Sequence, residues 1–149
     1  MIQPNKINVW IAPPAEGKTY KSVQYCIDML PSIKFIFATQ YKYQVVNMRR
    51  YIANLFNIVE SVKVTDAVSV LTGAVDTFDA NVIFDDVNKN VINLIALNDV
   101  LAKLSLNTVI ITVNPHIFYD DDLRKCINNL ISHYGEDAVN IIGNRIYYI

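Results

Sequence analysis

The stretch that decides the fold is IAPPAEGKTY, residues 11–20. It ends in Gly17-Lys18-Thr19, the close of a phosphate-binding loop with the pattern G-x-x-x-x-G-K-[ST]. The first position departs from this pattern, because Ala12 stands where glycine is usual. An apolar run at 7–11 predicts a strand before the loop, and the periodicity of 18–30 predicts a helix after it. The stretch therefore has the strand-to-helix context that such a loop requires.

Backbone N–H groups of such a loop, and of the helix that follows it, point at the phosphates of a nucleotide. We expect Lys18 to contact the β and γ phosphates and the Thr19 hydroxyl to ligate Mg²⁺. Pro13 and Pro14 carry no N–H, but they precede the donors. The residues expected to hold ATP are Ala15, Glu16, Gly17, Lys18, Thr19 and Tyr20. The alternative is a chance match in an ordinary turn.

Outside the loop, short apolar runs alternate with segments of helical periodicity. Strands are expected at 7–11, 33–38, 81–85, 108–113 and 139–142, with 62–65 as a further candidate, and helices at 18–30, 44–56, 91–104 and 120–134. Strands that are apolar on both faces, with helices between them, indicate a parallel sheet covered on both sides. The sequence therefore predicts one three-layer α/β domain over residues 1–149, with a mainly parallel five-stranded sheet.

The composition narrows the class of protein. Of the 149 residues, 52% are hydrophobic and 18% charged, and no apolar run approaches the ~18 residues that cross a bilayer. We expect no membrane insertion and, because Cys26 and Cys126 lie far apart without partner ligands, a reducing compartment such as the cytoplasm. The net charge of −1 provides no global basic field for nucleic acid, so any such binding depends on local patches.

Polar side chains follow two further predicted strands. Ligands of parallel α/β sheets bind at the carboxyl ends of the strands, so these positions are candidates for chemistry. We expect Asp85 to hold Mg²⁺ on a strand neighbouring the one before the loop, Asp86 to orient and deprotonate the attacking water, and Asn114 to sense the γ-phosphate. The alternatives are a solvated acidic turn for the two acids and an Asx turn before Pro115 for the asparagine.

These residues resemble the first RecA-like domain of superfamily 1 and 2 helicases, over nearly the whole chain. Residues 12–19 are similar to the A-x-x-x-x-G-K-T form of helicase motif I, and 37–42 to motif Ia, which touches the nucleic-acid backbone. Residues 64–71 are similar to a T-x-D-S-x-L segment of positive-strand RNA virus helicases. Asp85-Asp86 stands where that family has Asp-Glu, and Asn114-Pro115 near its Gly-Asp-Pro motif.

The resemblance implies Mg²⁺-dependent hydrolysis of ATP or another NTP, of the helicase or translocase type and from a viral protein, located in the host cytoplasm or nucleus. Asp86 is one methylene shorter than the usual glutamate, and His116 stands after Pro115 where the family has glutamine. A second RecA-like domain normally supplies arginines to the γ-phosphate. The resemblance therefore implies an arginine finger from another subunit of a homo-oligomer or from a partner, with Arg124 and Arg145 as candidates.

Single-stranded RNA or DNA is the expected partner, through a local patch. Tyr41-Lys42-Tyr43 is followed by Arg49-Arg50, and aromatic side chains among cations suit single strands because bases stack while phosphates pair. The residues expected to contact nucleic acid are Thr39, Tyr41, Lys42, Arg49 and Arg50. The alternative for this patch is an ordinary solvated helix start.

Three other functions stay open at this point. The acids and the asparagine are also similar to those of superfamily 3 helicases and of packaging ATPases, which work as rings of subunits. A degenerate phosphate-binding loop used for interaction, without significant turnover, is a second possibility. A doubly wound domain that binds no nucleotide is the third.

Overall fold

The computed structural model describes residues 1–29, 34–56, 62–119 and 121–147, the side chain of Arg145 excepted. The strands are β1 (Ile7–Ile11), β2 (Phe35–Thr39), β3 (Val62–Asp66), β4 (Ala80–Asp85), β5 (Leu106–Val113) and β6 (Val139–Gly143). The helices are α1 (Lys18–Met29), α2 (Val45–Phe56), α3 (Ala67–Leu71), α4 (Lys89–Asn98), α5 (Val100–Lys103) and α6 (Asp122–Tyr134). Short 3-10 helices lie at Lys42–Gln44, Pro115–Ile117, Glu136–Ala138 and Arg145–Tyr147.

The strands form one sheet in the order β3-β2-β4-β5-β1-β6, and every pairing is parallel. The prediction of an α/β fold with a parallel sheet is confirmed, but the number of strands was wrong, since the sheet has six strands rather than five. The additional strand is the candidate at 62–65. It forms an edge of the sheet and is only partly buried, so its apolar pattern is weaker than that of the central strands.

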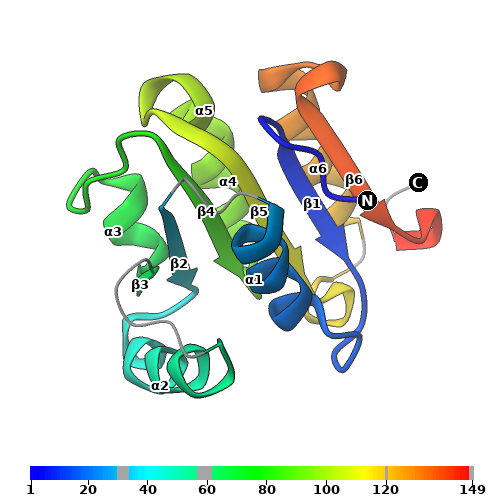
Figure 1. The fold of residues 1–149 in the computed structure, drawn as a ribbon. Helices are drawn as coiled ribbons and strands as arrows, with labels where there is room; N and C mark the ends of the chain where they lie inside the picture. The colour runs from blue at the N-terminus through cyan, green and yellow to red at the C-terminus, as the bar shows by residue number, and fades with distance from the viewer. Residues whose placement is uncertain (30–33, 57–61, 120, 148–149) are drawn as a thin grey trace.

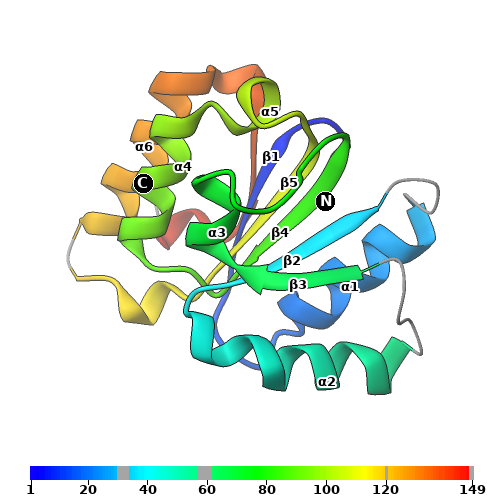
Figure 2. The ribbon, with the colours of Figure 1, turned by 90° about the vertical axis from the view of Figure 1, so that its left-hand side faces the viewer.

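Helices cover both faces of the sheet, which gives the three layers expected (Figures 1 and 2). On one face, α1 and α2 pack over a cluster that includes Val23, Phe37 and Ile83. On the other face, α3, α4, α5 and α6 enclose the larger cluster, which includes Val82 and Phe84. Ile83 points to the first face and its two neighbours to the second, as alternation along a strand requires. Among the described residues, no helix is long and apolar enough to span a bilayer.

Local chemistry explains where the helices differ from expectation. The helix predicted over 91–104 is two helices, because Asp99 adopts a left-handed conformation with φ 51° and interrupts it. The first of them begins earlier than predicted, since the Asn88 side chain accepts hydrogen bonds from the N–H groups of Asn90 and Val91. The sequence pattern missed α3, a five-residue helix that Asp66 caps by accepting from Ser69 N. Residues 30–33 and 120, at the predicted element ends, lie outside the described part of the chain.

The order of the strands brings the ends of β1, β5 and β4 side by side. β5 pairs with both other strands, so it lies between the strand that precedes the loop and the strand that ends in Asp85. The expectation that these two strands are direct neighbours was therefore wrong. Parallel strands are joined by long crossover connections, and such a connection can leave room for another strand between them. The spacing of residues along the chain therefore did not reveal that β5 lies between β1 and β4.

Candidate functional site

The loop between β1 and α1 contains two residues with positive φ. Ala15 and Gly17 adopt left-handed conformations, with φ 68° and φ 74°. Such residues turn successive N–H groups toward one concave side, where an anion is held. The loop is fixed at both ends, because Ala12 N donates to Val113 O of β5 and Lys21 N donates to Gly17 O to begin α1. The four residues from Pro14 to Gly17 are exposed, so the concave side is open to a ligand.

Lys18, the first residue of α1, lies back across the loop. Its Nζ donates to the carbonyl oxygens of Ala12 at 2.5 Å and Pro13 at 2.9 Å. Burial lowers the pKa of this ammonium group, while the negative charges of Asp86, Asp85 and Glu16 work in the opposite direction. A buried cation held by two neutral carbonyl groups gains from exchanging them for an anion, as the proposed role requires.

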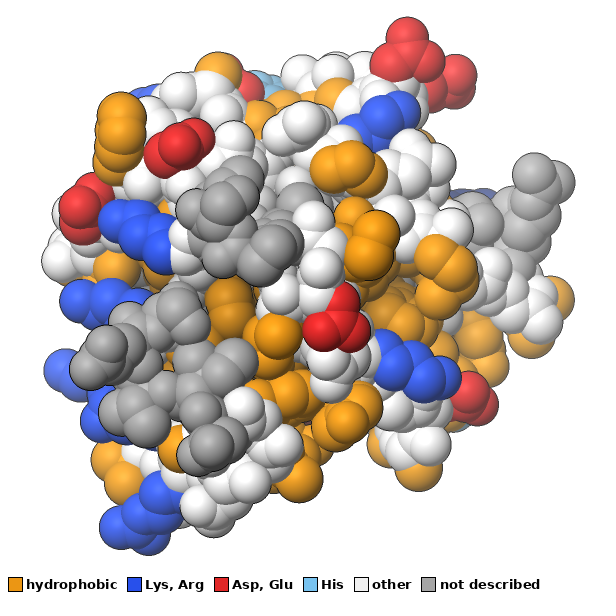
Figure 3. Space-filling model, viewed as in Figure 1, with side chains coloured by type: hydrophobic (Ala, Val, Ile, Leu, Met, Phe, Trp, Pro, Cys, Tyr) orange, Lys and Arg blue, Asp and Glu red, His pale blue; other side chains and the backbone are white. Residues whose placement is uncertain are grey.

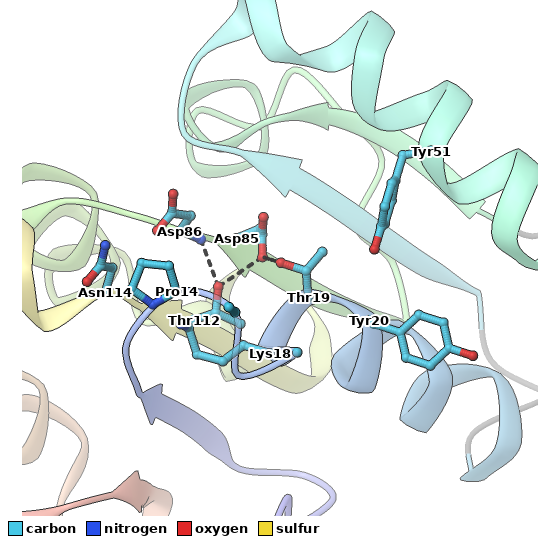
Figure 4. Close-up of a pocket in the computed structure, with 11 residues that line it drawn as sticks. Pro14, Lys18, Thr19, Tyr20, Tyr51, Asp85, Asp86, Thr112 and Asn114 are labelled. Atoms are coloured by element: carbon cyan, nitrogen blue, oxygen red, sulfur yellow. Dashed lines mark hydrogen bonds between the residues drawn. The ribbon is translucent and has the colours of Figure 1, made fainter.

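The Thr19 hydroxyl and the Asp85 carboxylate meet beside the loop. Thr19 Oγ1 donates to Asp85 Oδ1 at 2.8 Å, and Thr112 Oγ1 of β5 donates to the same oxygen at 2.9 Å (Figure 4). Burial raises the pKa of Asp85, with the nearby Asp86 adding to the rise, and the two hydroxyl donors and Lys18 oppose it. The residues named as metal ligands from sequence therefore touch each other, although they lie on separate elements.

This pair fits Mg²⁺ by the chemistry of its donors. Mg²⁺ takes oxygen ligands, and it is usually held by one or two carboxylates together with phosphates and water. Thr19 and Asp85 supply a hydroxyl and a carboxylate at one point of the pocket. Across the described ranges, no group of three or more His, Cys, Asp or Glu side chains gathers to hold a metal alone. A metal at this point would take its remaining ligands from water or from a bound phosphate.

A pocket of about 300 Å³ joins these groups. Its lining residues are Pro14, Ala15, Gly17, Lys18, Thr19, Tyr20, Tyr51, Asp85, Asp86, Thr112 and Asn114. Figure 4 shows Asn114, Pro14 and Asp86 toward one end, Lys18, Thr19 and Asp85 in the middle, and the two tyrosines toward the other end. Glu16 is exposed on the loop and is absent from this lining, so of the loop residues predicted to hold ATP it is the one outside the pocket.

Asp86 and Asn114 each have a defined local conformation. Asp86 is exposed, with φ 52°, and its N–H donates to Thr112 Oγ1 at 2.7 Å. Asn114 Oδ1 accepts from His116 N at 3.0 Å and caps the 3-10 helix that follows. The Asx turn considered as an alternative is therefore present, and the same side chain also lines the pocket.

Four of the residues predicted to contact nucleic acid lie outside the lining of this pocket, on the side of the molecule that carries β3 and α2: Tyr41, Lys42, Arg49 and Arg50. The fifth, Thr39, is the register partner of Asp85 in the sheet. Tyr41 and Tyr43 stack on each other with ring centroids 5.5 Å apart, and Lys42, Arg49 and Arg50 are exposed. Figure 3 shows cationic side chains along this side. A separate hollow of about 440 Å³ there is lined in part by Lys42, Arg49 and Lys63, the last of which the sequence reasoning missed.

Thr39 does not share the exposure of that group. Its side chain is buried, and Oγ1 donates to Tyr41 O at 2.8 Å and to Thr65 O at 3.3 Å. In this conformation the hydroxyl shapes the turn after β2 and does not face a ligand.

Of the two candidate arginine fingers, Arg124 pairs with Asp121 at 3.0 Å on the surface. The side chain of Arg145 lies outside the described part of the structure.

Sequence reasoning also missed Thr112 and Tyr51. Thr112 left a signal, a hydroxyl near the end of an otherwise apolar strand, but only the strand order shows that it reaches Asp85. Tyr51 left none, because nothing in the periodicity of α2 says that this helix reaches the loop.

Two solved structures share the fold of this chain over most of its length. The structure is similar to the helicase domain of Hef from Pyrococcus furiosus, with a TM-score of 0.63 at 15% identity, covering 92% of this chain and 35% of the other. It is also similar to the flagellar accessory protein FlaH from Methanocaldococcus jannaschii, with a TM-score of 0.53 at 15% identity, covering 86% of this chain and 69% of the other. No family model and no curated protein matches the sequence. The chain therefore shares with these two structures an α/β fold with a parallel sheet.

Proposed function

We propose that the protein binds and hydrolyses ATP or a related NTP with Mg²⁺, as a helicase- or translocase-type NTPase. The observation that carries this proposal is the meeting of the Thr19 hydroxyl and the buried Asp85 carboxylate beside Lys18, at the start of α1. Three residues chosen from sequence for phosphate and metal lie in one pocket with an open N–H cradle. A chance strand-to-helix turn has no reason to assemble them.

Each side chain has a role that follows from its position. Lys18 leaves the carbonyls of Ala12 and Pro13 to pair with the β and γ phosphates, so a charged partner replaces two neutral ones. Thr19 and Asp85 would hold Mg²⁺, which neutralises the charge of the phosphates when it is bound. Asp86 orients and deprotonates the attacking water, and Asn114 hydrogen-bonds the γ-phosphate or that water.

The helicase or translocase part of the proposal extends to partners. Exposed cations and a stacked tyrosine pair on the β3 and α2 side suit single-stranded RNA or DNA. The chain spans about a third of the Hef helicase domain chain, to which its fold is similar, so further elements of a motor would come from outside it. We propose that an arginine from another subunit or a partner completes the site. The viral type stays a prediction.

Steady-state ATP hydrolysis, with and without single-stranded RNA or DNA, tests the enzyme. We expect Mg²⁺-dependent turnover that nucleic acid stimulates, and complete loss in Lys18→Ala. Lys125→Ala, which removes an exposed cation of α6 outside the pocket, is the control and should keep the wild-type rate. Turnover no higher than background in folded wild-type protein, with or without nucleic acid, would exclude this function.

A second candidate is a nucleotide-binding module without significant turnover. Two observations favour it: among the described residues no arginine lines the pocket, and the candidate base Asp86 is shorter than a glutamate. In that case Mg-ATP raises the melting temperature, because it binds the native state alone, while no product forms. If Mg-ATP changes neither quantity, the site binds no nucleotide and both candidates are wrong.

A further inference from the structure

We propose that Tyr20 and Tyr51 form a stacking platform for the base of the nucleotide, so that the pocket takes purine nucleoside triphosphates with little choice between adenine and guanine. This inference rests on the proposed function, since it concerns the part of the same pocket that the phosphates do not occupy. It adds a substrate class to that function.

The two ends of the pocket are lined by different kinds of side chain. The groups suited to the γ-phosphate and the attacking water, Asp86 and Asn114, lie at one end, and Lys18 and Thr19 lie in the middle (Figure 4). A triphosphate chain with its γ-phosphate at the first end must leave its nucleoside at the other end. That end is lined by Tyr20, which follows Thr19 directly in α1, and by Tyr51 of α2.

Both tyrosines present ring surface that packing does not use. Tyr20 is 44% exposed and Tyr51 39% exposed, and neither belongs to the apolar cluster between the sheet and the helices α1 and α2. Tyr20 is nevertheless supported, because its ring lies 5.0 Å from that of Phe56 at an interplanar angle of 33°. Tyr51 directs its hydroxyl toward the pocket (Figure 4). A supported aromatic ring beside a phosphate site offers a base a surface for stacking at low entropic cost.

The polar atoms at this end explain the weak choice of base. Among the described lining residues there, the polar side-chain atom that points toward the pocket is the Tyr51 hydroxyl oxygen, which both donates and accepts, while the Tyr20 hydroxyl points away from it (Figure 4). Such a group satisfies the amino group of adenine and the carbonyl group of guanine equally well. Stacking tolerates any base but grows with ring area, so it favours purines over pyrimidines.

Titration calorimetry with Mg²⁺ present tests the platform, using ATP, GTP, CTP, UTP and inorganic tripolyphosphate as ligands. For the wild type we expect ATP and GTP to bind within about threefold of each other, and more tightly than CTP, UTP or tripolyphosphate, by about tenfold for one stacked base. Tyr51→Ala and Tyr20→Ala should each lose about tenfold in ATP affinity and keep the affinity for tripolyphosphate. Tyr51→Phe should bind ATP more tightly than Tyr51→Ala does, because it keeps the ring and loses only the hydroxyl.

Tyr119→Ala, which removes an 81% exposed tyrosine outside the pocket, is the matched control and should change nothing. The platform is excluded if wild-type protein binds tripolyphosphate as tightly as ATP, or if both alanine variants bind ATP normally. It is also excluded if tripolyphosphate affinity falls in step with ATP affinity, since the tyrosines then support the loop instead. In each of these cases the wild-type protein still binds tripolyphosphate, so the phosphate site is shown to exist. Wild-type protein that binds neither ATP nor tripolyphosphate overturns the proposed function together with this inference.

Discussion

At the scale of single residues, Asp85 is a carboxylate held where its charge is costly. It is buried, and its pKa is raised by burial and by the neighbouring charge of Asp86. The folded state therefore favours the protonated acid more than the unfolded chain does. Stability from this group is greatest below the unfolded pKa of about 3.9 and falls as the pH rises through the folded value. Near neutral pH the carboxylate lowers stability, as is common for functional groups.

Asp85→Asn should raise the free energy of unfolding at pH 7 by on the order of 1 kcal/mol and abolish Mg²⁺-dependent binding of nucleotide. The amide oxygen still accepts from Thr19 and Thr112, so the substitution removes the charge and keeps the contacts. Urea unfolding between pH 4 and pH 8 measures the first effect, and the gain over wild type should shrink toward pH 4. A variant that is less stable than wild type at pH 7 would contradict this account.

At the scale of elements, Thr112 joins the ends of β5 and β4. Its hydroxyl donates to Asp85 and accepts from Asp86 N, so it sets the positions of both acids. Thr112→Val keeps the shape and leaves a backbone N–H without its acceptor, which should cost about 1–3 kcal/mol. We expect ATP turnover to fall as well, because Asp86 loses its anchor.

Thr108→Val is the matched control for this substitution. Thr108 lies at the other end of β5, is equally buried, and its hydroxyl also accepts a backbone hydrogen bond, from Asn5 N at 2.9 Å. Urea unfolding should show a loss of stability in both variants, larger in Thr112→Val because it also loses the hydrogen bond to Asp85, while the rate of hydrolysis should fall only in Thr112→Val. Equal rates in the two variants would show that the link to Asp86 has no effect on the chemistry.

Gly143 determines how closely β6 approaches β1. It adopts φ 140°, and a Cβ built there would lie 2.2 Å from Ile11 O, the carbonyl just before the loop. Gly143→Ala should therefore cost about 3 kcal/mol or more, because two backbones would have to separate. Gly73→Ala is the control, since Gly73 has φ 81° with no atom within 4 Å of such a Cβ, and it should cost about 1–2 kcal/mol. Urea unfolding measures both, and equal losses would contradict the close approach.

At the scale of the whole molecule, the net charge is −1, but the charged side chains are unevenly distributed over the surface. Exposed Lys42, Arg49, Arg50 and Lys63 lie on the side that carries β3 and α2. If this side binds single-stranded nucleic acid, alanine at any one of the first three should flatten the dependence of log affinity on log salt by about one unit. Lys103→Ala, in α5, should leave the slope unchanged. Fluorescence anisotropy at several salt concentrations measures it, and equal slopes in all variants would exclude phosphate contacts here.

Most of the fold was accessible from local patterns. Apolar runs between segments of helical period indicated a parallel α/β sheet, since burial on both faces leaves such runs in the sequence. The edge strand β3 and the short helix α3 were harder to predict, because a half-exposed strand and a single capped turn leave only a weak hydrophobic pattern in the sequence. The break at Asp99 was missed because one left-handed residue does not disturb the apolar periodicity on either side of it.

The sequence alone determined which chemical groups this protein can bring to a ligand: a loop with free N–H groups, Lys18, Thr19 and a pair of acids after a buried strand. These are local properties of residue type and spacing. Only the tertiary structure decided that Thr19 touches Asp85, that Thr112 lies between the two acids and that Tyr51 of α2 reaches the pocket. The reason is physical, because strand order and helix placement follow from how apolar faces pack together, and this packing sets distances between residues that no spacing along the chain specifies.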